Sequence, residues 1–147
     1  MIGWSMNLFA VAIGGGLGAL CRYALTLLCT QTPLSKFIAG VSHLVGGGAS
    51  FATTLANLCG CLLLGMLYQW GETLASVGDS PMSPRMMLAI RVGVLGSLTT
   101  FSTLVGDAAV LGSEGRTTMS LTLMSVNLIG GWALFLIAAA SVRGVLS

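Results

Sequence analysis

The sequence predicts an all-α membrane protein, a single domain over residues 1–147 in which four helices cross the membrane. Hydrophobic residues make up 55% of the chain and charged residues only 7%, whereas soluble domains carry about 25% charged residues. Because so few charges cannot cover a surface that faces water, most of the surface must face lipid. Four apolar segments are each long enough to cross a hydrocarbon core of about 30 Å. The net charge of +2 is too small to indicate a nucleic-acid partner.

The first helix is expected over residues 6–29. Its GGGLGA run at residues 14–19 presents small residues on which another helix can pack closely. Arg22 comes late in this segment, and two roles remain open for it: an anchor that reaches the membrane interface, or a charge that attracts anions to a pore mouth. The residues before the helix include no basic side chain, so no cleaved signal peptide is expected.

A linker from Thr30 to Gly48 is polar enough to lie outside the membrane, with residues 37–44 close to the interface. It contains Lys36 and His43. Because His43 is the only histidine and has no cysteine or carboxylate near it in sequence, it is not expected to bind a metal. The cysteines lack the spacing of metal ligands and are expected to fill apolar space; they are Cys21, Cys29, Cys59 and Cys61.

The second helix is expected over residues 49–70. Thr53 lies near its start, Asn57 lies well inside it, and Tyr68 and Trp70 form an aromatic belt at its end. An asparagine inside a membrane helix is costly unless its amide finds hydrogen-bond partners. Asn57 therefore either joins helices together or lines a pore, and both roles remain open.

The third helix is expected over residues 86–110 and contains the stretch Gly93 to Leu104, GVLGSLTTFSTL. Arg91 precedes this stretch and Asp107 follows it, and the fifteen uncharged residues between the two charges span about 22 Å of helix. Near the middle of the membrane, polar groups are tolerated only where they face protein, water or an ion. The pattern therefore indicates a transport path, lined by five hydroxyl side chains within seven residues: Ser97, Thr99, Thr100, Ser102 and Thr103.

The fourth helix is expected over residues 118–142, after a tight turn at residues 112–116. It carries Asn127, a second amide inside the membrane. Several neutral groups in these segments can interact favourably with a negative charge: the two amides, the hydroxyl cluster and the electropositive ring edge of Phe101. Such groups suit an anion and, because they bear no full charge, they allow it to leave as well as to enter.

Other classes of function fit the sequence less well. There is no nucleophile–histidine–carboxylate set and no metal cluster, so an enzyme is not expected. A small multidrug exporter has the same size and helix count but needs a carboxylate inside its first helix, and residues 6–29 contain none. A non-transporting scaffold would explain the glycines and asparagines as packing devices. It would not explain five hydroxyl groups beside Phe101.

The basic residues are balanced between the two sides of the membrane. With four helices, both termini and the second loop share one side. The count is three against three: Arg85, Arg91 and Arg143 on that side, and Arg22, Lys36 and Arg116 on the other. Because orientation follows an imbalance of basic residues, this chain is expected to insert both ways and to form an antiparallel dimer. Four short helices also leave little room to enclose a path alone.

Five motifs together resemble the CrcB/Fluc fluoride channel family of small bacterial membrane proteins: GGGLGALCRY, TTLANLCGCLLLG, GVLGSLTTFSTL, EGR and VNLIGG. The resemblance covers nearly the whole chain. It implies a fluoride-selective channel in the bacterial inner membrane, an antiparallel dual-topology dimer with two fluoride pathways, and a third helix that is broken near its centre. It also implies a structural sodium ion, which is not transported and is held by the backbone carbonyls of Gly96 and Thr99.

The resemblance also assigns the fluoride pathway. Its pore asparagine corresponds to Asn57, with Thr53 one turn earlier. Its first pore phenylalanine corresponds to Phe101, with Ser102 and Thr103 beside it. The arginine at the pore mouth corresponds to Arg22, and the acidic residue after the third-helix motif to Asp107.

Three departures from the family pattern stand out. A second pore phenylalanine is replaced by Leu104, and a polar serine of the fourth helix by Gly131, although Asn127 one turn earlier can supply donors. The linker from Thr30 to Gly48 is longer than usual. These departures allow an alternative in which the chain is a pore-impaired subunit that pairs with a different, paralogous subunit.

Overall fold

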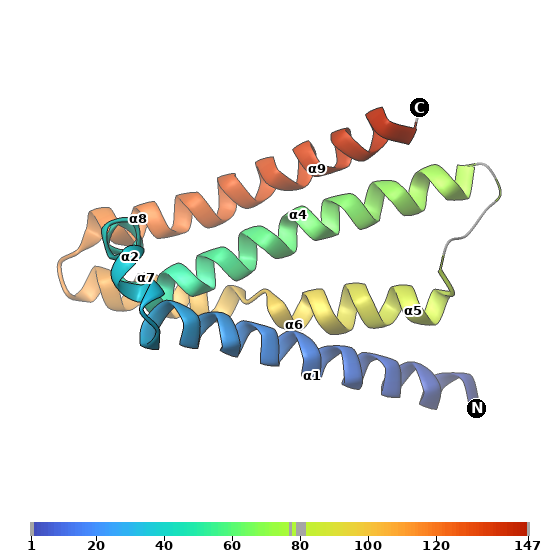
Figure 1. Cartoon of the computed structure of the whole chain (residues 1–147), viewed down its shortest axis with the longest axis horizontal. Helices are drawn as coiled ribbons and strands as arrows, with labels where there is room; N and C mark the ends of the chain where they lie inside the picture. Colours follow the sequence, from blue (N-terminus) through green and yellow to red (C-terminus); the bar gives the residue numbers. More distant parts are fainter. Residues whose placement is uncertain (1, 77, 79–81, 147) are drawn as a thin grey trace.

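The structure is a computed structural model that describes residues 2–76, 78 and 82–146, with side chains described for residues 4–76, 78 and 82–145. Four helical segments are long and apolar enough to cross a membrane: Trp4–Gln31, Gly48–Ser76, Pro84–Ser113 and Thr117–Val145. They lie side by side, and both chain ends are at the same end of the bundle (Figure 1). The predicted all-α, four-span architecture is therefore confirmed.

Helix α1 (Ile2–Gln31) packs on the third span through its small residues. A Cβ atom added to Gly14 would overlap the backbone oxygen of Ala89, and one added to Gly18 would overlap that of Val94. Only glycine permits the two backbones to approach this closely, as expected for small residues at membrane helix contacts. The prediction that this run forms a packing face is confirmed.

The linker between the first two spans is folded into short helices, which the sequence did not indicate. They are α2 (Leu34–Phe37), α3 (Ala39–Ser42) and η1 (His43–Val45), and they lie across one end of the bundle (Figure 1). Val45 is buried against the bundle, whereas the Phe37 and His43 side chains are exposed. Gly46 ends η1 with a φ of 98°, a left-handed conformation that glycine adopts at no steric cost.

Helix α4 (Gly48–Ser76) lies at the centre of the bundle, against α9 (Gly131–Leu146). The helix extends six residues beyond the expected end at Trp70, so the expected loop begins later. Beyond the apolar segment the helix continues with polar side chains. One of them, the Thr73 hydroxyl, donates a hydrogen bond to the Gln69 carbonyl of the same helix at 2.9 Å. Hydropathy marked the part that crosses lipid, while the helical hydrogen bonding continues past it.

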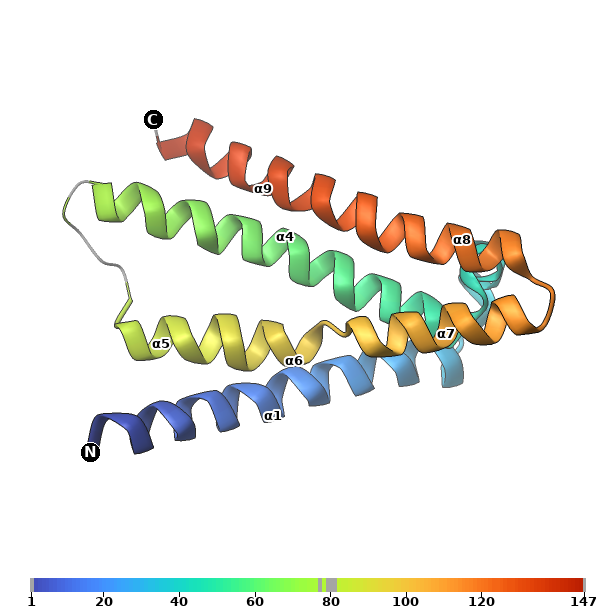
Figure 2. The ribbon, with the colours of Figure 1, turned by 180° about the vertical axis from the view of Figure 1, so that it is seen from behind.

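The third span consists of four consecutive pieces. They are α5 (Pro84–Leu88), the wider π-helical turn η2 (Ala89–Leu95), α6 (Gly96–Leu98) and α7 (Phe101–Ser113). Thr99 and Thr100 between α6 and α7 have extended backbone, with ψ angles of 151° and 114°. The irregular stretch is visible near the middle of the span, between α6 and α7 (Figure 2). Thr100 then caps α7, because its hydroxyl accepts a hydrogen bond from the Thr103 N–H at 3.3 Å.

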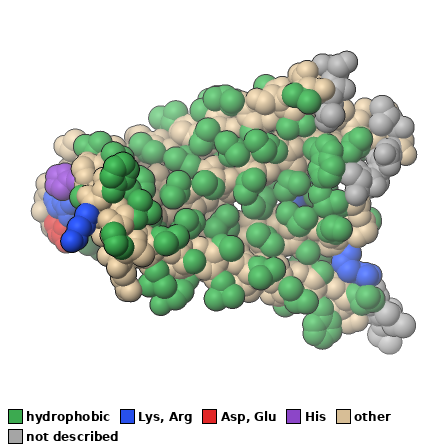
Figure 3. Space-filling model, viewed as in Figure 1, with side chains coloured by type: hydrophobic (Ala, Val, Ile, Leu, Met, Phe, Trp, Pro, Cys, Tyr) green, Lys and Arg blue, Asp and Glu red, His purple; other side chains and the backbone are tan. Residues whose placement is uncertain are grey.

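The fourth span is built from α8 (Thr117–Ser125), the π-helical turn η3 (Val126–Gly130) and α9. Gly115, with a φ of 76°, makes the turn that leads into it. Hydrophobic side chains cover the length of the molecule, while most of the charged side chains in view and the histidine lie at its ends (Figure 3). This distribution is that of a protein whose middle section faces the acyl chains of a bilayer.

Candidate functional site

The two membrane asparagines meet inside the bundle. Asn57 of α4 donates from Nδ2 to Oδ1 of Asn127 at 2.9 Å, and both side chains are less than a tenth exposed. Asn127 in turn donates to the Thr54 hydroxyl oxygen at 3.0 Å and to the Leu123 carbonyl at 2.8 Å. These bonds join the second and fourth spans and give Asn57 the partners that an amide in lipid requires.

Asn57 also bridges the irregular backbone of the third span. The Thr100 N–H donates to Asn57 Oδ1 at 2.8 Å, and Asn57 Nδ2 donates back to the Thr100 carbonyl at 3.4 Å. In an uninterrupted α-helix the Thr100 N–H would instead donate to the carbonyl of Gly96. The amide therefore replaces a backbone partner, and the Gly96 carbonyl loses its usual intrahelical donor.

Hydroxyl groups surround the start of α7. The Thr100 hydroxyl donates to that of Thr103 at 3.0 Å and lies 3.4 Å from that of Ser102. Ser102 and Thr103 are exposed on the single chain, and Phe101 beside them is 66% exposed. Half of the predicted pathway groups therefore lie on the outer face of the bundle.

A crevice of about 290 Å³ lies beside these groups. Its walls include five of the residues predicted for the fluoride pathway or the sodium site. The lining residues are Asn57, Gly60, Cys61, Leu64, Arg91, Leu95, Gly96, Thr99, Thr100, Phe101, Leu104, Asn127 and Leu128. Amide and hydroxyl groups and the Arg91 guanidinium supply its polar side, and apolar side chains supply most of the rest. Such a crevice can take a small ion through neutral dipoles and through backbone oxygens.

Some predicted site residues lie away from this crevice. Thr53 is buried on α4 one turn before Asn57, and Arg22 is half-buried on α1; neither belongs to the described residues that line the crevice. Leu104 is only 2% exposed and packs in a cluster at the linker end with Val45, Ala108, Leu111 and Leu123. Leu104, where the family pattern has a phenylalanine, is therefore part of the chain's own core and also part of the crevice wall.

Three contributors to the site were missed from the sequence: Thr54, Arg91 and the backbone of Thr100. Thr54 had a usable signal, because it lies three residues before Asn57 and hence on the same helix face. The pairing of Asn57 with the Thr100 backbone had none, since it joins residues 43 positions apart. From the sequence, Arg91 was interpreted as the end of an uncharged stretch and as one of the basic residues that set orientation, not as part of the site.

Side-chain metal ligands do not gather in the part of the chain that the structure describes. No group of three or more histidine, cysteine, aspartate or glutamate side chains could hold a metal ion there. All four cysteines are free, and His43 is exposed. A cation at this site would therefore depend on backbone carbonyls, such as the one that Gly96 presents.

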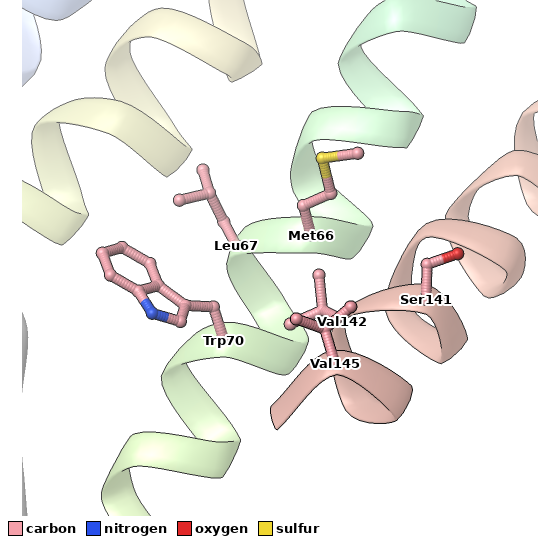
Figure 4. Close-up of a pocket in the computed structure, with 6 residues that line it drawn as sticks. All are labelled: Met66, Leu67, Trp70, Ser141, Val142 and Val145. Atoms are coloured by element: carbon pink, nitrogen blue, oxygen red, sulfur yellow. The ribbon is translucent and has the colours of Figure 1, made fainter. Parts of the chain in front are cut away.

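A second cavity, of about 350 Å³, lies between the ends of α4 and α9 (Figure 4). It is lined by Met66, Leu67, Trp70, Ser141, Val142 and Val145. The Ser141 hydroxyl donates to the Ile137 carbonyl of its own helix at 2.8 Å. Because the walls are almost entirely apolar, this cavity suits a hydrocarbon chain and offers no groups that would hold an ion.

Comparison with known proteins identifies the family. The family model described as CrcB-like protein, Camphor Resistance (CrcB), matches residues 9–140. A protein of Rhodopirellula baltica named fluoride-specific ion channel FluC is 47% identical over 144 residues, which covers 93% of this chain and 94% of that protein. Proteins with the same name from Shewanella halifaxensis and Shewanella sp. (strain ANA-3) are 33% and 36% identical and cover 82% and 74% of this chain and 83% and 73% of their own lengths. The match spans the motifs of all four helices, and the chain therefore belongs to the CrcB family.

Proposed function

We propose that this chain is a fluoride-selective ion channel, not an enzyme, which lets cytoplasmic fluoride leave the cell passively and so lowers its toxicity. The observation that carries this proposal is the cluster of neutral hydrogen-bonding groups beside the crevice of a membrane bundle: the Asn57–Asn127 pair, the hydroxyls around Thr100, and Phe101. The names of the relatives support fluoride as the ion.

Fluoride would cross by exchanging its hydration water for these donors. In the structure, both N–H groups of each asparagine amide already have acceptors within the chain. The contact from Asn57 Nδ2 to the Thr100 carbonyl is the longest of these, at 3.4 Å, and is therefore the weakest. We expect fluoride to replace this acceptor first. The hydroxyls of Ser102 and Thr103 and the edge of Phe101 would take the ion onward, with Thr53 contributing from α4.

The membrane potential supplies the driving force. Fluoride enters a cell as its neutral acid, dissociates at the higher internal pH and is trapped as the anion. A potential that is negative inside drives each such charge outward with about 2.3 kcal/mol per 100 mV. A passive channel in the inner membrane therefore suffices, and no coupling ion is required.

A structural sodium ion fits the irregular centre of the third span. Carbonyls that lack intrahelical donors are the groups that coordinate sodium in broken membrane helices. Gly96 presents such a carbonyl because its usual donor, the Thr100 N–H, is taken by Asn57. The Gly96 and Thr99 carbonyls would hold the ion, which would contribute positive charge and rigidity where α6 and α7 meet.

The working unit would be an antiparallel dimer of this chain. Phe101, Ser102 and Thr103 are exposed on a single chain. Apart from their contacts with Thr100, the two hydroxyl groups would face acyl chains that offer no hydrogen bond. A second copy that covers them would complete the pathway. The equal number of basic residues in the two halves of the chain's membrane bundle supports insertion in both orientations.

The direct test is fluoride efflux from liposomes that contain only this purified chain, with valinomycin and potassium to carry the counter-charge. We expect fast fluoride efflux, and retention of chloride in matched vesicles. Vesicles without protein give the background leak. A folded dimer that releases no fluoride would contradict a self-sufficient channel and would indicate a subunit that needs a different partner.

A further inference from the structure

Arg91 is a charged residue within the third membrane span. It lies in η2, seven residues after Pro84 begins the third span and eight residues before Thr99. At 1.5 Å per residue the distance from Arg91 to the irregular centre is about 12 Å, less than half the thickness of a hydrocarbon core of about 30 Å. An arginine at this depth either extends to the membrane interface or faces water, a cavity or a partner charge.

The Arg91 side chain lines two cavities. One is the crevice that holds Asn57, Thr99 and Phe101. The other, of about 450 Å³, opens toward the α5 end of the span and is lined by Leu64, Pro84, Met87, Leu88 and Val92 in addition to Arg91. Arg91 therefore stands between the end of the bundle that carries the termini and the site itself.

The Tyr68 ring lies beside the Arg91 guanidinium. The Arg91 Cζ atom lies 6.0 Å from the centroid of the Tyr68 ring, at the reach of a cation–π contact. A contact with a ring uses none of the guanidinium N–H groups as a conventional hydrogen-bond donor, so these groups can donate to another partner. Within residues 4–76, 78 and 82–145, the one ion pair joins Arg116 to Glu114, so no described carboxylate neutralises Arg91, not even Glu72, one turn beyond Tyr68.

We infer that Arg91 is an anion-binding residue at the entrance to the site from the α5 end. This inference rests on the proposed function and adds a residue that it did not include. A guanidinium without a fixed counter-charge takes a mobile anion as its partner, and a cleft with low-dielectric walls strengthens that attraction. The anion binds first to Arg91 and then moves to the neutral groups around Asn57, which bind it less tightly.

An anchoring role would place the same side chain differently. An anchor extends along the apolar surface to the interface, as Arg85 does at the start of the span, where its Nε donates to Asn7 Oδ1 at 3.4 Å. Arg91 instead turns toward Tyr68 on α4 and lines the crevice. The two residues lie six positions apart in one span, so Arg85 provides a matched control.

The test compares Arg91→Gln, Arg91→Lys and Arg85→Gln with the parent in the liposome assay, at several ionic strengths set with an impermeant salt. We expect Arg91→Gln to lower fluoride flux by about fivefold or more at low ionic strength and to flatten its dependence on salt. Arg91→Lys should keep most of the flux, and Arg85→Gln should match the parent. Equal flux for Arg91→Gln and the parent at every ionic strength would overturn the inference.

A second measurement separates this inference from the proposed function. The Arg91 Nε–H resonance in detergent micelles, assigned by its loss in Arg91→Lys, is followed during titration with sodium fluoride and with sodium chloride. A saturable shift supports an anion site at Arg91 even if the parent releases no fluoride from liposomes. An unchanged resonance with both salts would contradict the site even if the parent conducts.

Discussion

At the scale of single residues, Asn57 has a structural role within the chain and a proposed role in the fluoride pathway. Its amide joins the second, third and fourth spans through Asn127 and the Thr100 backbone, which is a structural role. The same amide faces the crevice, which is the place of a pore-lining group. The two roles are compatible under the proposed mechanism, because one contact of the amide is long, at 3.4 Å, and is the contact that the ion would replace.

Asn57→Asp should therefore abolish fluoride flux and weaken the fold. The carboxylate would place acceptors against the Thr100 carbonyl and Asn127 Oδ1, which now receive hydrogen bonds, and would repel fluoride. We expect a loss of about 2 to 4 kcal/mol in the free energy of unfolding, from unpaired buried groups. Flux is measured in liposomes and stability by unfolding in detergent. Asn7→Asp, the same change at an exposed position, is the control; undiminished flux in Asn57→Asp would remove Asn57 from the pathway.

At the scale of elements, the packing of α1 on the third span depends on glycine. The Val94 carbonyl of η2 occupies the space where a side chain of Gly18 would begin. Because that neighbour is backbone, it cannot turn away as a side chain can. The position of α1 therefore supports the third span close to its irregular centre.

Gly18→Ala should destabilise the bundle by about 1 to 3 kcal/mol, since the added methyl group forces two backbones apart. Gly16→Ala in the same helix is the matched control, because a methyl group there meets no atom within 4 Å. The control should be neutral or up to about 1 kcal/mol more stable, through its helix propensity. Thermal unfolding of both variants in one detergent measures the difference, and equal stabilities would refute the close contact at Gly18.

At the scale of the whole molecule, the distribution of charge decides how the chain meets the membrane. Basic residues are equal in number in the two halves of the molecule, three against three, and the sides of the bundle are apolar. Such a chain has no strong preference for either orientation. Copies of the chain must insert in both orientations if an inverted copy is to cover the exposed face that carries Phe101.

The dual orientation can be read with reporters fused to the C-terminus. A cytoplasmic fluorescent reporter and a periplasmic phosphatase should both be active when fused to the parent chain. Adding positive charge with Ser76→Lys and Gly144→Lys changes the count to five against three, and should leave only the fluorescent reporter active. Cells that carry this charge-altered variant should be less resistant to fluoride than cells that carry the parent chain, because chains of a single orientation cannot form antiparallel pairs. A parent chain with one active reporter would contradict dual insertion.

Much of the fold followed from composition and spacing. The four spans, the shared side of the termini and the packing face at residues 14–19 were all predicted and are confirmed. Element ends were less well predicted: α4 continues to Ser76, and the linker forms α2, α3 and η1. Hydropathy reports where lipid begins and ends, whereas a helix ends where its backbone hydrogen bonds end.

The candidate site shows the same division between sequence and tertiary structure. The sequence by itself determined that lipid is the solvent, that two amides and a hydroxyl cluster lie inside it, and which family motifs are present. Only the tertiary structure decided that Asn57 bonds to both Asn127 and the Thr100 backbone. It also decided that Arg91 contacts the Tyr68 ring and lines the crevice. The reason is geometric: spacing along one helix fixes which residues share a face, but the rotation of one helix against another depends on the packing of all four spans.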